Sequence, residues 1–226
     1  MEVKVYKYCQ SMYNPLKGCQ TLRLGTTSSF RKNYKGEGDF INDPKEGLAD
    51  WRDIHRNTFA SIQACPDGYI FCTVTKKLTF DKVHSDFDGT YDDCYAINDI
   101  HGFTQELNTL ILFQLNYENI NPKSWYYSTA FRNLQLPENK LGISCQSFRR
   151  KIFYRKDAKP RMMDNLSADQ ILALAHFHKP KRFEKQSEYR IFFCAFRWKA
   201  GLYLDIRNDN PLYIDTSSLM KYLQNC

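Results

Sequence analysis

The first residues that could do chemistry lie where a short strand ends. Arg23 stands between Leu22 and Leu24, and because side chains alternate between the two faces of a strand, its guanidinium points away from both leucines. Gly25, Thr26 and three further hydroxyl residues follow directly. Backbone amides next to a glycine, hydroxyl groups and an arginine fork together suit a phosphate or carboxylate. The segment predicts an anion site, with a solvated turn at the end of a strand as the alternative.

A long polar segment, residues 26–47, holds a second group. Pro44 fixes its own backbone angle and favours a turn, which places the carboxylates of Asp43 and Glu46 close together. Two close carboxylates can hold a metal, share a proton, or accept hydrogen bonds from arginines and ribose hydroxyls. An exposed turn capped by Asp43 is the alternative. The segment also contains Arg31 and Tyr34.

The third group opens a strand near the end of the chain. Glu188 and Arg190 alternate with apolar residues at a period of two, so their side chains share one strand face and can orient each other. Gln186 extends the same face toward the preceding loop. The aromatic density of the strand predicts burial, and buried charges need a partner or a purpose. The alternative is an ion pair on a solvated sheet surface, which is worth about 0 to 1 kcal/mol.

Size and charge narrow the class of protein. The chain has 226 residues, of which 42% are hydrophobic and 15% aromatic, enough for the core of a single domain that spans residues 1–226. The net charge of +7 attracts phosphate-bearing ligands and nucleic acid. The basic run Arg149 to Lys151, set among aromatic residues, suits the backbone of a nucleic acid or, equally, a solvated strand edge.

The eight cysteines and five histidines show no metal-ligand spacing. Cys72, Cys145 and Cys194 lie in apolar runs, where a reduced cysteine packs as a small hydrophobic side chain. This pattern predicts reduced thiols and a cytoplasmic protein. No apolar run approaches the roughly 18 residues that a membrane-spanning helix needs, so no membrane partner is expected.

Strand patterns outnumber helix patterns, and there is no long strand–helix alternation. The sequence therefore predicts an α+β fold with one mixed, largely antiparallel sheet and a few short helices. A turn at Pro66–Gly68 predicts a hairpin between strands at residues 58–64 and 69–75. Asn98 or Asp99 is expected to cap a helix that follows. Further strands are expected around Val5 and at residues 21–24, 92–97, 125–134, 143–154, 188–198 and 202–206, and a further helix at 167–177.

Several of these segments, in this order, resemble a group of uncharacterised bacterial stand-alone domains. The resemblance spans most of the chain. It rests on Leu22 to Thr26, Phe30-Arg31, Asp43 to Gly47, Ile70 to Cys72 and Phe183 to Ile191. Membership in such a group implies no particular activity.

A second similarity is to ADP-ribosyltransferases of the arginine, Ser-Thr, glutamate type, through Arg23, Ser128-Thr129 and Gln186 to Glu188. It implies that NAD is the substrate, that Arg23 holds the NAD phosphates and that Glu188 is the catalytic carboxylate. Such a carboxylate stabilises an oxocarbenium-like centre and needs neither a metal nor a nucleophilic residue. The fold is then expected to be ADP-ribosyltransferase-like.

The same resemblance implies further roles around these two residues. Gln186 would help to choose the acceptor, Arg190 would orient the catalytic carboxylate, and Tyr8 or Tyr34 would stack on a base. The expected activity is modification of nucleic acid or protein by a bacterial toxin or phage-defence effector. The residues expected to bind NAD are Tyr8, Thr26, Arg31, Tyr34, Glu46, Gln186 and Arg190.

Two other classes of function are open from the sequence. A metal-dependent nuclease or nucleic-acid-binding module would hold a divalent metal through Asp43, Glu46 and Glu188 near the basic run. A non-catalytic interaction domain would use Glu188 and Arg190 only as a structural pair. EDTA separates the nuclease from a transferase, which needs NAD alone.

Overall fold

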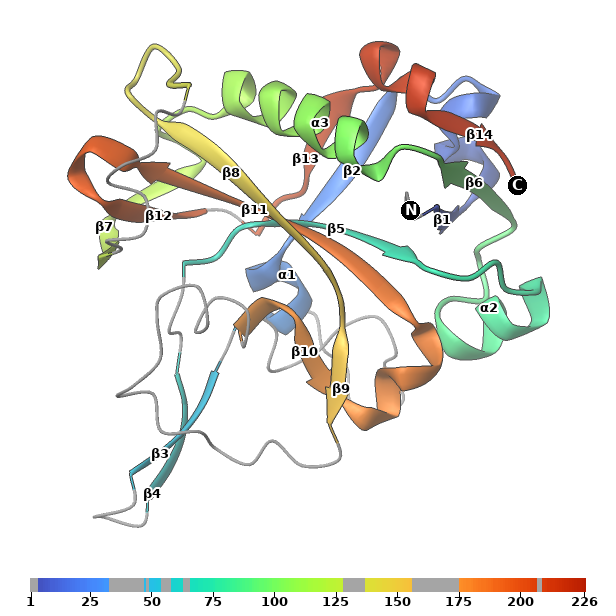
Figure 1. The fold of residues 1–226 in the computed structure, drawn as a ribbon, viewed down its shortest axis with the longest axis horizontal. Helices are drawn as coiled ribbons and strands as arrows, with labels where there is room; N and C mark the ends of the chain where they lie inside the picture. The colour runs from blue at the N-terminus through green and yellow to red at the C-terminus, as the bar shows by residue number, and fades with distance from the viewer. Residues whose placement is uncertain are drawn as a thin grey trace.

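The computed structural model of the protein describes residues 4–32, 47, 49–53, 58–62, 66–127, 137–155, 175–206 and 209–226 (Figure 1). Within these ranges, ten strands form one sheet in which every pairing is antiparallel. Their order is β14-β6-β1-β5-β11-β12-β7, with β2 joined to β5, β13 joined to β2, and β8 joined to β11. The predicted α+β class with a largely antiparallel sheet is confirmed.

The strands of this sheet are β1 (Val5–Cys9), β2 (Thr21–Thr26), β5 (Tyr69–Val74), β6 (Asp93–Ile97), β7 (Ile120–Tyr127), β8 (Ser144–Lys151), β11 (Glu188–Arg197), β12 (Leu202–Ile206), β13 (Leu212–Asp215) and β14 (Leu223–Asn225). Two further pairs are β3 (Ala49–Asp53) with β4 (Thr58–Ile62), antiparallel, and β9 (Phe153–Arg155) with β10 (His178–Pro180), parallel. The described α-helices are α1 (Thr27–Lys32), α2 (Phe80–Asp86) and α3 (Ile100–Gln114). The described 3₁₀ helices are η1 (Ser11–Tyr13), η2 (Pro15–Lys17), η4 (Lys181–Gln186), η5 (Trp198–Ala200) and η6 (Ser217–Tyr222).

Helix α3 covers one face of the sheet (Figure 1). The side chain of Asp99 accepts a hydrogen bond from the backbone amide of Gly102 at 2.8 Å and so caps the helix, as predicted. Phe103, Leu107 and Ile111 recur at helical spacing and are fully buried against the sheet. Among the described residues, no helix is both long and apolar enough to cross a membrane.

Strand β11 is the centre of the sheet because it pairs with β5, β8 and β12. Ile191 and Phe193 point into the core under α3. Glu188, Arg190 and Phe192 point to the opposite face, as the period of two predicted. That face is also covered: α1 and β10 lie on it (Figure 1), and all three side chains are buried.

The hairpin predicted across Pro66–Gly68 is wrong. β4 pairs with β3, whereas β5 pairs with β1, β2 and β11. The segment before β5 is bound to β12 instead, because the amide of Asp67 donates to Asp205 Oδ1 at 2.8 Å and the amide of Ile206 donates to the Asp67 carbonyl at 3.0 Å. A turn signal in the sequence marks a change of direction but does not name the partner of the next strand.

Other expected elements are shifted or fall outside the described residues. The segment at 26–47 was expected to be a loop, but its first residues form α1, and residues 33–46 lie outside the described ranges. β7 begins before the predicted 125–134 strand, and residues 128–136 are not described. Of the helix expected at 167–177, the structure describes only the end, where Ala175 and His176 are helical.

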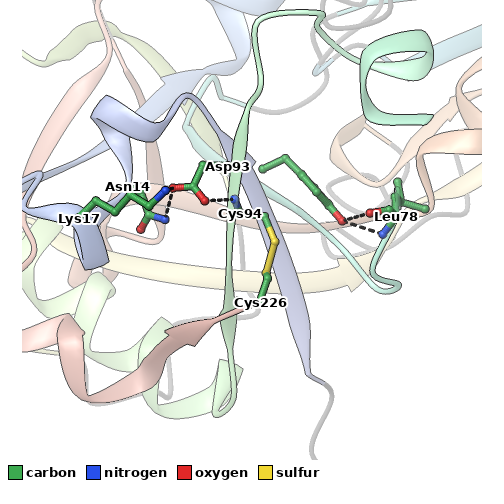
Figure 2. Close-up of a disulfide and its surroundings, with 7 residues drawn as sticks. Asn14, Lys17, Leu78, Asp93, Cys94 and Cys226 are labelled. Carbon is green, nitrogen blue, oxygen red and sulfur yellow. Dashed lines mark hydrogen bonds and ion pairs between the residues drawn. A yellow bond between two sulfur atoms is a disulfide. The ribbon is translucent and has the colours of Figure 1, made fainter. Parts of the chain in front are cut away.

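A disulfide joins Cys94 in β6 to Cys226, so the expectation that the thiols are reduced is wrong for these two cysteines (Figure 2). The link holds the end of the chain beside β14, which pairs with β6 at the edge of the sheet. Figure 2 shows Asp93 next to this disulfide, accepting from Asn14 Nδ2 at 2.7 Å and from Lys17 Nζ at 2.9 Å. The free cysteines among the described residues are Cys9, Cys19, Cys72, Cys145 and Cys194.

Candidate functional site

A cavity of about 130 Å³ lies where β1 and β2 separate along β5. Glu188 and Arg190 line it from the face of the sheet opposite α3, and Phe71 lines it from the face under α3. β1 pairs with one end of β5, where Tyr6 is opposite Val74, and β2 pairs with the other end, where Gly25 is opposite Ile70. The two strands diverge between these pairs, and the cavity forms there. The ring of Phe30 packs over Gly25 and forms part of the wall, so that a Cβ atom on Gly25 would stand 2.7 Å from it. The predicted site residues that line the cavity are Tyr8, Arg23, Gln186, Glu188 and Arg190.

A buried carboxylate lies on one side of the cavity between two cations. Arg190 Nε lies 2.8 Å from Glu188 Oε1 and Lys179 Nζ lies 2.8 Å from Glu188 Oε2, and all three side chains are at most 4% exposed. Arg190 Nη1 also donates to the carbonyl of His176 at 2.7 Å. Burial by itself raises the pKa of Glu188, but the two cations outweigh it and hold that pKa well below its ordinary value. The carboxylate therefore stays ionised.

The cavity carries more positive than negative charge. Besides the two cations bound to Glu188, Lys7 and Arg23 line it, so four cations face one carboxylate and three positive charges are left over. Among the described residues, neither Lys7 nor Arg23 forms an ion pair with a carboxylate. Lys7 Nζ donates to the Cys72 carbonyl at 2.9 Å, and burial lowers the pKa of Lys7. Arg23 is exposed and marks the mouth of what we call the basic cavity, lined by Lys7, Arg23, Lys179, Glu188 and Arg190.

Tyr8 and Gln186 line the cavity, but their polar groups form hydrogen bonds to backbone groups outside it. The Tyr8 hydroxyl donates to the Leu78 carbonyl at 2.8 Å and accepts from the Leu78 amide at 2.6 Å, so only its ring faces the cavity. Gln186 Nε2 donates to the carbonyl of Asp86 at 3.1 Å, which fixes the side chain at the edge of η4. Both residues shape the wall of the cavity.

Thr26 and Arg31, which were expected to bind NAD, do not line the cavity and have other partners. Thr26 Oγ1 accepts from the Ser29 amide at 3.0 Å, and the Thr26 amide donates to Ser29 Oγ at 3.2 Å, so the pair caps α1. Arg31 binds the carboxylate of Asp67 with two nitrogens at 2.9 and 2.7 Å. The hydroxyl run after Gly25 therefore starts a helix and does not face the cavity.

The remaining predicted residues lie outside the described ranges. These are Tyr34 and Glu46, together with Asp43 and Ser128-Thr129. Whether Glu46 and Glu188 share one site, which the sequence left open, falls outside the described residues.

Replacing Thr26 by Ala is expected to lower the free energy of unfolding by about 1 kcal/mol, because the amide of Ser29 loses its cap. Chemical denaturation measures this. Affinity for inorganic pyrophosphate is expected to stay unchanged. Thr21→Ala, at an exposed position of the same strand, is the control and should change stability by less than about 0.5 kcal/mol. If the Thr26 variant kept its stability but bound pyrophosphate more weakly, Thr26 would be a ligand-binding residue and not a helix cap.

The basic cavity does not suit a divalent metal. Glu188 already neutralises part of the charge of Lys179 and Arg190, and the remaining cations repel a metal ion. In the part of the chain that the structure describes, no group of three His, Cys, Asp or Glu side chains could hold one. Asp43 and Glu46, the other predicted ligands, lie outside that part.

Lys7 and Lys179 are the charged cavity residues that sequence reasoning missed. Lys7 alternates with Tyr6 and Tyr8 in β1, a pattern that equally describes a solvated strand face. Lys179 precedes Pro180 and was expected to follow the end of a helix. Neither position carries a local signal, because only the pairing of distant strands brings these amines to the same space.

Comparison of this chain with models of protein families, with curated proteins and with solved structures finds no match in any of the three. Its function therefore has to be argued from the charge and geometry of the basic cavity. The basic cavity combines surplus positive charge with a carboxylate that is ionised at neutral pH.

Proposed function

We propose that the basic cavity binds the phosphate groups of a nucleotide, and that the protein transfers ADP-ribose from NAD to nucleic acid or protein. The observation that carries the first part is the pair Lys7 and Arg23, two cations of the cavity wall that no described carboxylate neutralises. Lys7 is held partly out of water and binds an anion more strongly than a surface cation does, because water screens the interaction less. A pyrophosphate group would offset the surplus charge.

Lys7 and Arg23 suit different parts of such a ligand. Arg23, at the mouth, presents a planar fork that can bind two phosphate oxygens at once. Lys7, deeper in the cavity, is a compact charge held by the Cys72 carbonyl. Binding a phosphate would raise the pKa of Lys7 again, because an adjacent anion favours the protonated amine.

Glu188 supplies the chemistry that ADP-ribosyl transfer requires. The two carboxylate oxygens accept from Lys179 and Arg190, and the roughly four lone-pair sites of a carboxylate leave room for a ribose hydroxyl. In the reaction, the bond between the ribose and nicotinamide breaks and the bonding electrons leave with nicotinamide. The acceptor forms a new bond to the ribose carbon and releases its proton to solvent. An ionised carboxylate near that carbon stabilises the oxocarbenium-like transition state. Arg190 and Lys179 hold Glu188 in position.

The test is the release of nicotinamide from NAD by the purified protein, measured by chromatography with nucleic acid or protein as acceptor. Arg23→Gln is expected to raise the KM for NAD roughly tenfold or more, because it removes a charge-assisted hydrogen bond. Lys140→Gln removes a positive charge from an exposed position outside the cavity wall and should leave the KM unchanged. No nicotinamide release by the wild-type protein with either acceptor would rule out the transferase.

Two further measurements separate the competing functions. Nucleic-acid cleavage that stops with EDTA would favour a metal-dependent nuclease over the transferase. A melting temperature that does not change with NAD, nucleotides or pyrophosphate would favour an interaction domain, because a ligand that binds the folded state must raise it.

A further inference from the structure

An exposed aromatic side chain lies beside the mouth of the basic cavity. Tyr213 in β13 stands directly opposite Arg23 in the antiparallel pair with β2. Opposite residues of such a pair share one face of the sheet, with Cβ atoms roughly 5 Å apart. The neighbouring pair of Leu22 and Ile214 is buried in the core on the other face. Tyr213 is 53% exposed, so its ring stands on the cavity face next to the arginine of the mouth.

The size of the cavity decides which part of a nucleotide it can hold. Its volume is about 130 Å³, whereas sites that enclose a complete drug-sized ligand measure roughly 300 to 1,000 Å³. The phosphates and an adjoining sugar can occupy it, but the base cannot enter as well. A nucleotide whose phosphates lie between Lys7 and Arg23 must therefore carry its base outside, on the surface around the mouth.

We propose that Tyr213 is the platform on which the base of the ligand stacks, so that the ligand class of this site is a nucleotide and not a sugar phosphate or inorganic phosphate. The proposal rests on the proposed function, because it takes the cavity as the phosphate site. Arg23 connects the two parts: its guanidinium binds the phosphates while the ring directly across the strand pair receives the base. Every base has a flat π face, so this contact selects for a base without selecting which one.

Calorimetric titration with ADP and with inorganic pyrophosphate tests the stacking. The wild-type protein is expected to bind ADP at least roughly fivefold more tightly than pyrophosphate, which is the lower end for one base on one aromatic ring. Tyr213→Ala should remove this preference and leave pyrophosphate affinity unchanged. Tyr213→Phe, which keeps the ring, should retain it. Phe113→Ala removes an aromatic ring that is 72% exposed on α3, on the other face of the sheet, and should change neither affinity.

The outcomes separate the two proposals. Wild-type protein that binds pyrophosphate but prefers ADP by less than about twofold would overturn the stacking proposal and leave the phosphate site standing. A Tyr213→Ala variant that keeps the full preference for ADP would overturn it as well. Wild-type protein that binds neither ligand would overturn the phosphate site, and the stacking proposal with it.

Discussion

Replacing Glu188 by Gln is expected to lower the free energy of unfolding by about 3 to 5 kcal/mol, the range for removing one partner of a buried ion pair. The change leaves Arg190 and Lys179 buried without a carboxylate, each having lost an ionic contact of 2.8 Å. Chemical denaturation of both proteins at neutral pH measures the difference. The matched control is Glu184→Gln, which removes a 57% exposed carboxylate paired with Lys181 at 3.8 Å and should cost less than about 1 kcal/mol.

The pH dependence of this difference identifies its cause. The pKa of Glu188 in the folded protein lies below its ordinary value of 4.5, so its contribution to stability is present above pH 4.5 and is lost as the pH falls toward the folded pKa. The stability gap between wild type and variant should therefore be widest at neutral pH and narrow in acid. If the difference in free energy of unfolding were similar at all pH values, the variant would be destabilised by altered packing and not by the loss of the ion pairs.

This result also limits how Glu188 can be used to study activity. A variant that loses several kilocalories of stability can lose activity without the carboxylate taking part in the reaction. Arg23 is the cleaner position because its side chain is exposed and no described carboxylate depends on it. Loss of activity in Arg23→Gln with an unchanged melting temperature can be assigned to the ligand.

Replacing Lys7 and Arg23 together by Gln is expected to weaken the binding of pyrophosphate by at least about 100-fold at neutral pH. Each cation would make one charge-assisted hydrogen bond, worth about 1.5 to 3 kcal/mol. The other two cations of the cavity wall, Lys179 and Arg190, are paired with Glu188. Titration calorimetry at fixed ionic strength measures the two affinities. The fold should survive the change, since burying the Lys7 amine is itself unfavourable.

The pH profile shows whether Lys7 takes part. Burial lowers the pKa of Lys7 below its ordinary value of 10.5, and only the protonated amine attracts an anion. Affinity for pyrophosphate should therefore fall as the pH rises through the lowered pKa, and begin to fall at a lower pH than an exposed lysine would cause. Lys7→Arg stays charged throughout and should bind without that fall. An identical alkaline fall in the wild type and in Lys7→Arg would exclude Lys7 from the site.

The sequence by itself determined the features that depend on local periodicity. The alternation in β11 placed Glu188 and Arg190 on one face, and the structure gives that pair a contact of 2.8 Å. Asp99 followed by apolar residues at helical spacing gave the start of α3 and its cap. The period of two also gave the direction of Arg23, because a strand fixes the side to which each residue points whatever its partner strand is.

Tertiary structure alone decided which chemical groups share a space. Lys7 and Lys179 reach the cavity because β1 and β2 separate along β5 and because β10 packs beside β11, and no local pattern encodes such distant pairings. Thr26 and Arg31 have the composition of an anion site, yet the capping of α1 and the carboxylate of Asp67 satisfy their polar groups. The type of a residue limits which groups its side chain can bind. Which partner it binds is settled by the chain segments that fold against it, and these are remote in sequence.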